Sequence, residues 1–121
     1  MEAKRKRELR VRRHDRLRKK VKGTSSRPRL SIFKSTRHFY AQIIDDDSAR
    51  TLAAASTLSP EIKDEIKSSS ASEAAEKVGA HIAKRAKKAG IESVVFDHGG
   101  FGYRGKIKKF AEKARAEGLK F

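Results

Sequence analysis

The chain contains no cysteine and no long apolar run, and it is poor in acidic residues. Without cysteine it can form no disulfide, no thiolate metal site and no cysteine nucleophile. No apolar run approaches the ~18 residues that a membrane-spanning helix needs. The basic N-terminal stretch is not followed by the apolar region of a secretory signal. These absences exclude a disulfide scaffold, fit a reducing compartment, and lead us to expect neither a membrane span nor a signal peptide.

Positive charge is what the chain has in excess. It has 31 Lys and Arg residues against 15 Asp and Glu in 121 residues, for a formal net charge of +16. Residues 1–37 carry net +13, residues 38–83 net −4 and residues 84–121 net +7. A charge of this size predicts a polyanionic partner, nucleic acid first and an anionic membrane surface second; a small acidic substrate would not require it.

We expect residues 1–23 to form a basic arm and residues 24–121 to form one globular domain. The first 22 residues include 12 Lys or Arg, and they have too few apolar side chains to fold against a core. Leu9, Leu17 and Val21 fall on one side of a helix, and this thin stripe predicts one line of contact. We expect the arm to be frayed when free and to become helical on RNA; a solvated tail or a localisation signal is the alternative.

The hydrophobic periodicity predicts the order β-β-β-α-β-α after the arm. The predicted strands are residues 29–34, 39–44, 50–57 and 94–96, and the predicted helices are a short one at 60–67, a long one at 71–89 and a last one that ends at Gly118. The strand after the long helix should lie parallel to a neighbour, because a crossover connection returns the chain in the same direction. The fold class is therefore α/β (α+β), with a single mixed sheet and helices packed on it.

Several local signals refine this prediction. Ser59 is placed to cap the short helix ahead of Pro60, and Ser70 with Glu73 forms a capping box for the long one. Leu119 and Phe121 are expected to fold back onto the core.

Phe33, Tyr40 and Gln42 should share one face of the first two strands, beside Ser31. Aromatic rings flanked by amides and cations suit unpaired bases and ribose hydroxyls. For Tyr40 and Gln42 we favour this exposed, polar role. For Phe33 the pattern fits an exposed ring and a core ring equally well.

Residues 100–105 match the G-x-G-x-x-G pattern of dinucleotide-binding loops, after a predicted strand and before a helix. That fold also needs a following strand and an acidic residue about 20 positions further on, and the chain provides neither. The glycines would still let backbone N–H groups approach a phosphate closely, with Phe101 and Tyr103 as stacking faces and cations at Arg104 and Lys106. A purely structural turn is the alternative.

Other polar groups do not form a catalytic or metal site. Residues 45–47 are three consecutive Asp residues, which we interpret as a charged turn, because no second carboxylate cluster accompanies them. The four histidines lack the spacing of metal ligands, and no nucleophile stands near the pair Asp97 and His98. We therefore expect no enzyme activity, no cofactor and no small-molecule substrate.

Four stretches resemble one known family: residues 16–21, residues 27–35 with 38–46, residues 71–89 with 94–97, and residues 99–121. The family is the eighteenth protein of the bacterial large ribosomal subunit, which binds 5S rRNA. The resemblance covers nearly the whole chain and implies a mixed α/β domain with an N-terminal arm. It also implies a structural role in the cytoplasm, where the family helps attach 5S rRNA to 23S rRNA in the central protuberance of the ribosome, beside other 5S-binding proteins.

The charge pattern and the resemblance point to the same rRNA-binding segments: the arm, the hairpin over residues 27–42 and the loop over residues 98–106. The predicted rRNA-binding residues are Arg5, Arg7, Arg10, Arg12, Arg13, His14, Arg16, Arg18, Lys19, Lys20, Lys22, Arg27, Arg29, Ser31, Phe33, Lys34, Ser35, Arg37, His38, Tyr40, Gln42, His98, Gly99, Gly100, Phe101, Tyr103, Arg104, Gly105 and Lys106. We expect a monomer when free and no membrane partner. The rival hypotheses are a DNA-compacting protein of the nucleoid type and, more remotely, a nucleotide-dependent enzyme built on the glycine loop.

Overall fold

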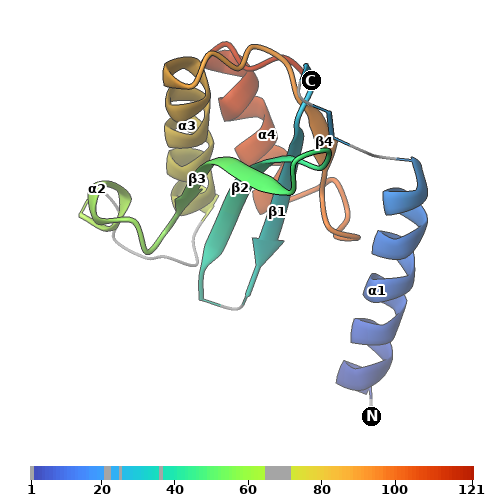
Figure 1. The fold of residues 1–121 in the computed structure, drawn as a ribbon. Coiled ribbons are helices and arrows are strands. Elements are labelled where there is room, and N and C mark those ends of the chain that lie inside the picture. Colours follow the sequence, from blue (N-terminus) through green and yellow to red (C-terminus); the bar gives the residue numbers. More distant parts are fainter. Residues whose placement is uncertain (1, 21–22, 25, 36, 65–71) are drawn as a thin grey trace.

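A computed structural model describes residues 2–20, 23–24, 26–35, 37–64 and 72–121, with only the backbone at 2–5 and 17–20. Its elements in chain order are α1 (Glu2–Lys20), β1 (Arg29–Lys34), β2 (Phe39–Asp45), β3 (Arg50–Ser56), α2 (Pro60–Lys63), α3 (Ser72–Lys88), β4 (Val95–Asp97) and α4 (Lys106–Ala116). After the arm this is the predicted order of strands and main helices, and α2 lies within the range 60–67 of the predicted short helix. Figure 1 shows α3 and α4 on one face of the sheet and α1 outside this layer, beyond β4.

The four strands form one mixed sheet in the order β3-β2-β1-β4. β1 pairs antiparallel with β2, β2 pairs antiparallel with β3, and β4 pairs parallel with β1. The predicted fold class, with a single mixed sheet, and the parallel fourth strand are thus confirmed. The parallel pairing follows from the crossover through α3, which brings the chain back to run beside β1 in the same direction.

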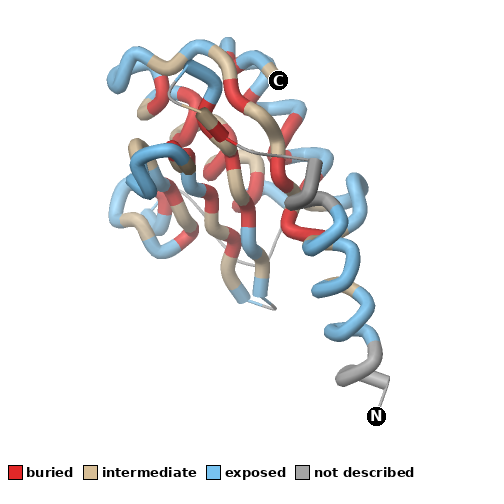
Figure 2. Tube along the Cα trace, turned by 45° about the vertical axis from the view of Figure 1, so that its right-hand side comes forward, coloured by how far each residue is buried: buried red, intermediate tan, exposed pale blue. Residues whose placement is uncertain are grey.

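Alternation along β1 and β2 decides which side chains face the helices. Leu30 and Ile32 of β1 lie opposite Ile43 and Ala41 of β2, and all four are buried. The intervening side chains point to the other face, where Phe33 is exposed. The apolar core therefore lies between one face of the sheet and the α3–α4 layer, and Figure 2 shows the buried residues gathered there.

Small side chains on α3 bring it close to α4. The core side of α3 is largely Ala, with Gly79 buried among them. A Cβ added at Gly79 would lie 2.6 Å from the carbonyl oxygen of Phe110 on α4. Because that contact is shorter than van der Waals packing allows, only glycine permits this spacing between the two helices.

The C-terminal segment returns to the core as predicted. Leu119 is buried and Phe121 packs against Phe96, with 5.1 Å between ring centroids. The backbone N–H of Val94 donates to the carbonyl of Lys120 over 2.9 Å, and Lys120 forms an isolated parallel bridge with Ser93 just before β4. In the part of the chain that the structure describes, no helix is long and apolar enough to cross a membrane.

Some local predictions differ from the structure. Ser59 occupies the N-cap of α2, but its side chain makes no capping bond; its Oγ accepts the N–H of Ser56 at 3.1 Å instead. The helix predicted over 60–67 is described only for Pro60–Lys63, and Ser70 of the predicted capping box lies outside the described residues. In the predicted apolar stripe of the arm, Leu9 is 41% exposed, and Leu17 and Val21 are not among the described side chains.

Candidate nucleic-acid interface

The face of the sheet opposite α3 and α4 carries the predicted aromatic and amide side chains. Strand pairing sets Phe33 opposite Tyr40 and Ser31 opposite Gln42. The rings of Phe33 and Tyr40 lie 6.0 Å apart between centroids. Phe33 is 51% exposed, so the exposed alternative for this residue is the correct one. The prediction that these four residues share one face is confirmed.

A cationic groove lies between α1 and the end of β1. It has a volume of about 550 Å³ and is lined by Lys6, Arg7, Arg10, Arg13, Phe33, Lys34 and Ser35. Five of these seven side chains are cationic and none is acidic. The groove therefore offers positive charge from two elements around one exposed aromatic ring, a combination that suits a phosphate backbone with an unstacked base. Lys6 was not among the predicted contacts.

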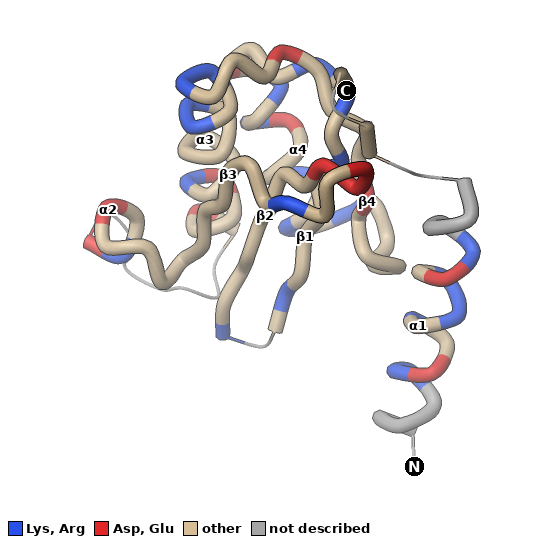
Figure 3. The backbone as a smooth tube through the Cα atoms, viewed as in Figure 1, with Lys and Arg blue, Asp and Glu red and all other residues tan. Residues whose placement is uncertain are grey.

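Cations also stack over aromatic rings beside the groove. The guanidinium carbon of Arg10 lies 4.8 Å from the ring centroid of Phe101 and 6.0 Å from that of Phe33. The ammonium of Lys34 lies 5.5 Å from the Phe101 centroid. Such contacts hold long cationic side chains near one position without neutralising their charge. Figure 3 shows Lys and Arg residues along α1. The acidic β2–β3 turn lies at the end of β2 that is farther from the hairpin loop between β1 and β2.

The glycine loop divides into two halves with different surroundings. Gly99 and Gly100 are buried and adopt positive φ angles of 68° and 79°. The Gly99 N–H donates to Asp97 Oδ1 at 2.9 Å, and the Gly100 carbonyl accepts the Nε–H of Arg13 at 2.9 Å. These two glycines therefore have structural partners within the chain. The second half, residues 102–105, is exposed and leads into α4, whose first turn contains no acidic residue.

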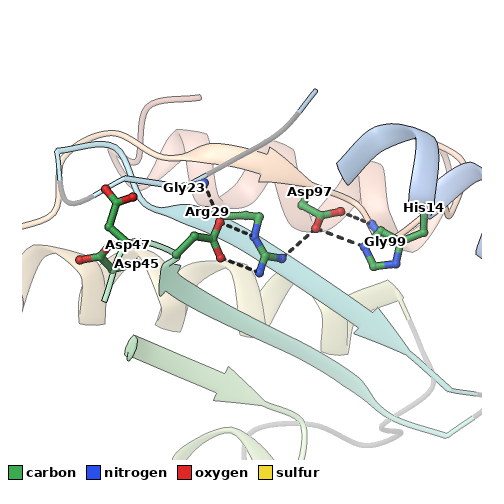
Figure 4. A network of polar contacts seen from close by, with 8 residues as sticks. His14, Gly23, Arg29, Asp45, Asp47, Asp97 and Gly99 are labelled. Carbon is green, nitrogen blue, oxygen red and sulfur yellow. Dashed lines mark hydrogen bonds and ion pairs between the residues drawn. The ribbon is translucent and has the colours of Figure 1, made fainter. Parts of the chain in front are cut away.

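Asp97 is the centre of a polar network that joins distant parts of the chain (Figure 4). It is fully buried, and its Oδ2 lies 2.9 Å from Arg29 Nη1 and 3.2 Å from His14 Nε2. The Arg29 guanidinium also donates two bonds of 3.1 Å to Asp46, whose Oδ2 accepts the Gly23 N–H at 2.7 Å. The network thus connects α1, the segment after it, β1, β4 and the β2–β3 turn.

The charge on Arg29 is stabilised inside this network. Burial acts to lower the pKa of Arg29, but hydrogen bonds and charge from Asp46, and then from Asp97, outweigh it and raise that pKa. Its side chain is 11% exposed. Arg29 therefore balances two carboxylates, and little of its charge is presented to solvent.

The remaining predicted rRNA contacts differ in their exposure and in their hydrogen-bond partners. Arg27, Arg37, Arg104 and the described arm cations Arg7, Arg12 and Arg16 are exposed. His38 Nδ1 lies 3.0 Å from Thr57 Oγ1, and His98 Nδ1 is buried with no hydrogen-bond partner among the described residues. The predicted contacts whose side chains lie outside the described residues are Arg5, Arg18, Lys19, Lys20 and Lys22.

The three consecutive Asp residues form a turn, as predicted. Asp45 Oδ1 accepts the N–H of Asp47 at 3.0 Å, and Asp46 binds Arg29. No group of three or more His, Asp or Glu side chains suited to a metal ion occurs among the described residues. Sequence reasoning did not identify Asp46 and Asp97 as partners of Arg29; for Asp97 the available signal was an acidic residue two positions before a glycine pair in a basic region.

Comparisons with known proteins agree with this chemistry. Residues 4–121 match the family described as ribosomal L18 of archaea, bacteria, mitochondria and chloroplast. The chain is 57% identical over 114 residues to the large ribosomal subunit protein uL18 of Dictyoglomus thermophilum, covering 94% of this chain and 93% of the relative. It is 53% identical over 116 residues to uL18 of Thermotoga petrophila, covering 96% and 95%. A third relative, uL18 of Caldicellulosiruptor saccharolyticus, is 54% identical over 114 residues, which make up 94% of this chain and 92% of the relative.

Proposed function

The chain belongs to the L18 family of large-subunit ribosomal proteins, and from this premise we propose that it binds 5S rRNA and helps attach it to 23S rRNA in the central protuberance. As a bacterial-type constituent of the large subunit, it acts in the cytoplasm within the ribosome, with rRNA and other ribosomal proteins as partners. The choice of 5S rRNA rests on the resemblance of the hairpin and the C-terminal region to the family. The proposal includes no catalytic step.

The cationic groove is the observation that carries RNA binding. It sets five cations around Phe33, which is half exposed. Phosphates would bind the cations of α1 and Lys34, while an unpaired base would stack on Phe33 next to Tyr40 and Gln42. The proposed contacts among described side chains are Lys6, Arg7, Arg10, Arg12, Arg13, Arg16, Arg27, Ser31, Phe33, Lys34, Ser35, Arg37, Tyr40, Gln42, Tyr103, Arg104 and Lys106.

Binding assays with matched nucleic acids test this function. The chain should bind 5S rRNA more tightly than an RNA duplex of equal length, and duplex DNA should compete poorly. Equal competition by duplex DNA would instead favour a DNA-compacting protein. In cell extracts the chain should co-sediment with the large subunit and leave it together with 5S rRNA at high salt.

The open sheet face provides the test of specificity. The double change Tyr40→Ala with Gln42→Ala should reduce the preference for 5S rRNA over the duplex, because it removes a stacking face and an amide from the surface proposed to read unpaired nucleotides. Arg50→Ala is the matched control, since it removes an exposed cation from β3 and should lower both affinities together. An unchanged preference in the double variant would restrict these two residues to a structural role.

A further inference from the structure

The described part of α1 lies against the domain through polar contacts and has little apolar contact with it. Its described apolar side chains, Leu9 and Val11, are 41% and 45% exposed. Hydrophobic burial therefore contributes little to its position. The contacts that do hold it come from Arg10, Arg13 and His14, and all three reach residues that follow β4 or its last residue, Asp97.

These contacts define an arm seat, made of Asp97, Gly99, Gly100 and Phe101. Asp97 accepts from Gly99 with Oδ1, which shapes the loop, and contacts His14 and Arg29 with Oδ2. A buried carboxylate is strongly destabilising unless such partners compensate for its lost hydration. The seat therefore uses one negative charge to bind both the arm and β1.

The backbone of α1 supplies a second and independent observation. Gly100 has a φ of +79°, and a Cβ added to it would lie 2.8 Å from the backbone nitrogen of His14. The approach between loop and helix is thus closer than any side chain at Gly100 permits. Arg13 fixes the same point by donating to the Gly100 carbonyl.

We propose that Asp97 and Gly100 are positioning residues for RNA binding, which hold α1 so that its cations and Phe33 form one preformed groove. This inference rests on the RNA binding proposed above. A held arm loses less conformational freedom on binding than a free one, so preformation raises affinity. A buried acidic residue would thereby strengthen the binding of a polyanion, whereas simple charge counting predicts that removing it helps.

The test compares Asp97→Asn with the control Asp64→Asn, which removes an equal charge from an exposed turn directly after α2. Figure 1 shows α2 on the side of the molecule opposite to α1. Affinity for 5S rRNA is measured at one salt concentration, with thermal unfolding as a check on folding. We expect Asp97→Asn to lower affinity roughly tenfold, the size of one lost charge-assisted interaction, while Asp64→Asn leaves it unchanged or slightly raised. Equal or higher affinity in both variants would overturn the proposal.

Distances between spin labels provide a readout that does not depend on RNA. The chain has no cysteine, so Glu8→Cys and Ser48→Cys, both at exposed positions, give one label on α1 and one on the β2–β3 turn. The distance distribution should be narrow in the parent chain and broad with Asp97→Asn. A narrow distribution in both would show that Asp97 does not position the arm.

A second variant keeps the proposal testable if Asp97→Asn fails to fold. Gly100→Ala changes no charge but places a methyl group against α1, so it should broaden the distances and lower affinity in the same way. The control Gly102→Ala lies in the exposed half of the loop, where only the Arg104 side chain is near an added Cβ, and it should leave the label distances unchanged. If the parent chain binds no 5S rRNA, the proposed function fails, and the label distances still decide whether the seat holds the arm.

Discussion

At the scale of single residues, net charge overstates what the chain can offer to a phosphate backbone. Arg29 donates to Asp46 and Asp97, and the carboxylates raise its pKa against the effect of burial. Arg13 donates to a backbone carbonyl of the glycine loop. Arg29 helps to build the interface, whereas the exposed Arg12, Arg13 and Arg16 are the better candidates for direct phosphate contact.

We expect Phe33 to contribute more to RNA binding than to the stability of the fold. Phe33→Ala should weaken 5S rRNA binding by about 1–3 kcal/mol, the cost of losing one stacked base. It should cost only about 1 kcal/mol of unfolding free energy, because half of the side chain is already exposed. Binding assays and urea denaturation measure the two quantities.

Phe39, next to the same hairpin loop, is the matched control. It is buried and its ring lies 5.1 Å from that of Phe110, so Phe39→Ala should lower the unfolding free energy by about 3–5 kcal/mol. If Phe33→Ala destabilised the fold as much as Phe39→Ala, the ring would belong to the core and the groove hypothesis would lose its aromatic group.

At the scale of elements, the contact between α3 and α4 depends on one glycine. Gly79→Ala would gain about 1 kcal/mol from helix propensity if space allowed. The added Cβ would instead meet the Phe110 carbonyl at 2.6 Å, and backbone cannot move aside as a flexible side chain can. We expect a net destabilisation of about 1–3 kcal/mol, measured by urea denaturation.

A change at Ala80, the next residue of α3, measures the effect of helix propensity without the contact to α4. Ala80 follows Gly79 on α3 and is partly exposed, so Ala80→Gly should cost about 1 kcal/mol. Stabilisation by Gly79→Ala would mean that α3 and α4 can separate at little cost and that their spacing is not fixed by this contact.

Local patterns predict the elements well and their docking poorly. Alternation predicts the strand over residues 29–34, and its Leu30 and Ile32 are the buried pair; helical spacing predicts the last helix, and its Ile107 and Phe110 are buried. The seat of α1 could not be predicted in this way, because it depends on a long-range pairing of His14 with Asp97 and carries no hydrophobic period. The glycine pattern indicated correctly that another group approaches this loop closely. At its first half that group is the backbone of α1, and the sequence alone cannot distinguish such an approach from that of a phosphate.

The arm and the domain should be separable as elements of folding. We propose that residues 24–121 fold without the arm, because the buried core identified among the described residues begins at Leu30. A chain lacking residues 1–22 should therefore unfold in one cooperative transition, with a modest loss of stability from the exposure of Asp97. Urea denaturation followed by circular dichroism measures this, and a broad, non-cooperative transition would show that the arm is needed for the fold.

At the scale of the whole molecule, most of the positive charge is carried near one end of the chain. Residues 1–37 contribute net +13 to a total of +16, while residues 38–83 are net negative. The cations of α1 and the acidic β2–β3 turn lie in different regions of the structure (Figure 3). We therefore expect a polyanion to be attracted mainly to α1 and the groove, with bases near the open sheet face.

This arrangement predicts a steep dependence of 5S rRNA binding on salt. Each phosphate that the protein neutralises releases condensed counterions, and about six such contacts would lower affinity roughly 10³-fold between 50 and 200 mM salt, if duplex DNA is a fair guide. Removing residues 1–22 takes away 12 Lys and Arg residues, so the truncated chain should bind weakly and show a much shallower salt slope. Titrations at four or more salt concentrations measure both slopes. Equal slopes for the two chains would mean that the arm does not contact phosphates, and that the attraction comes from the hairpin and the glycine loop alone.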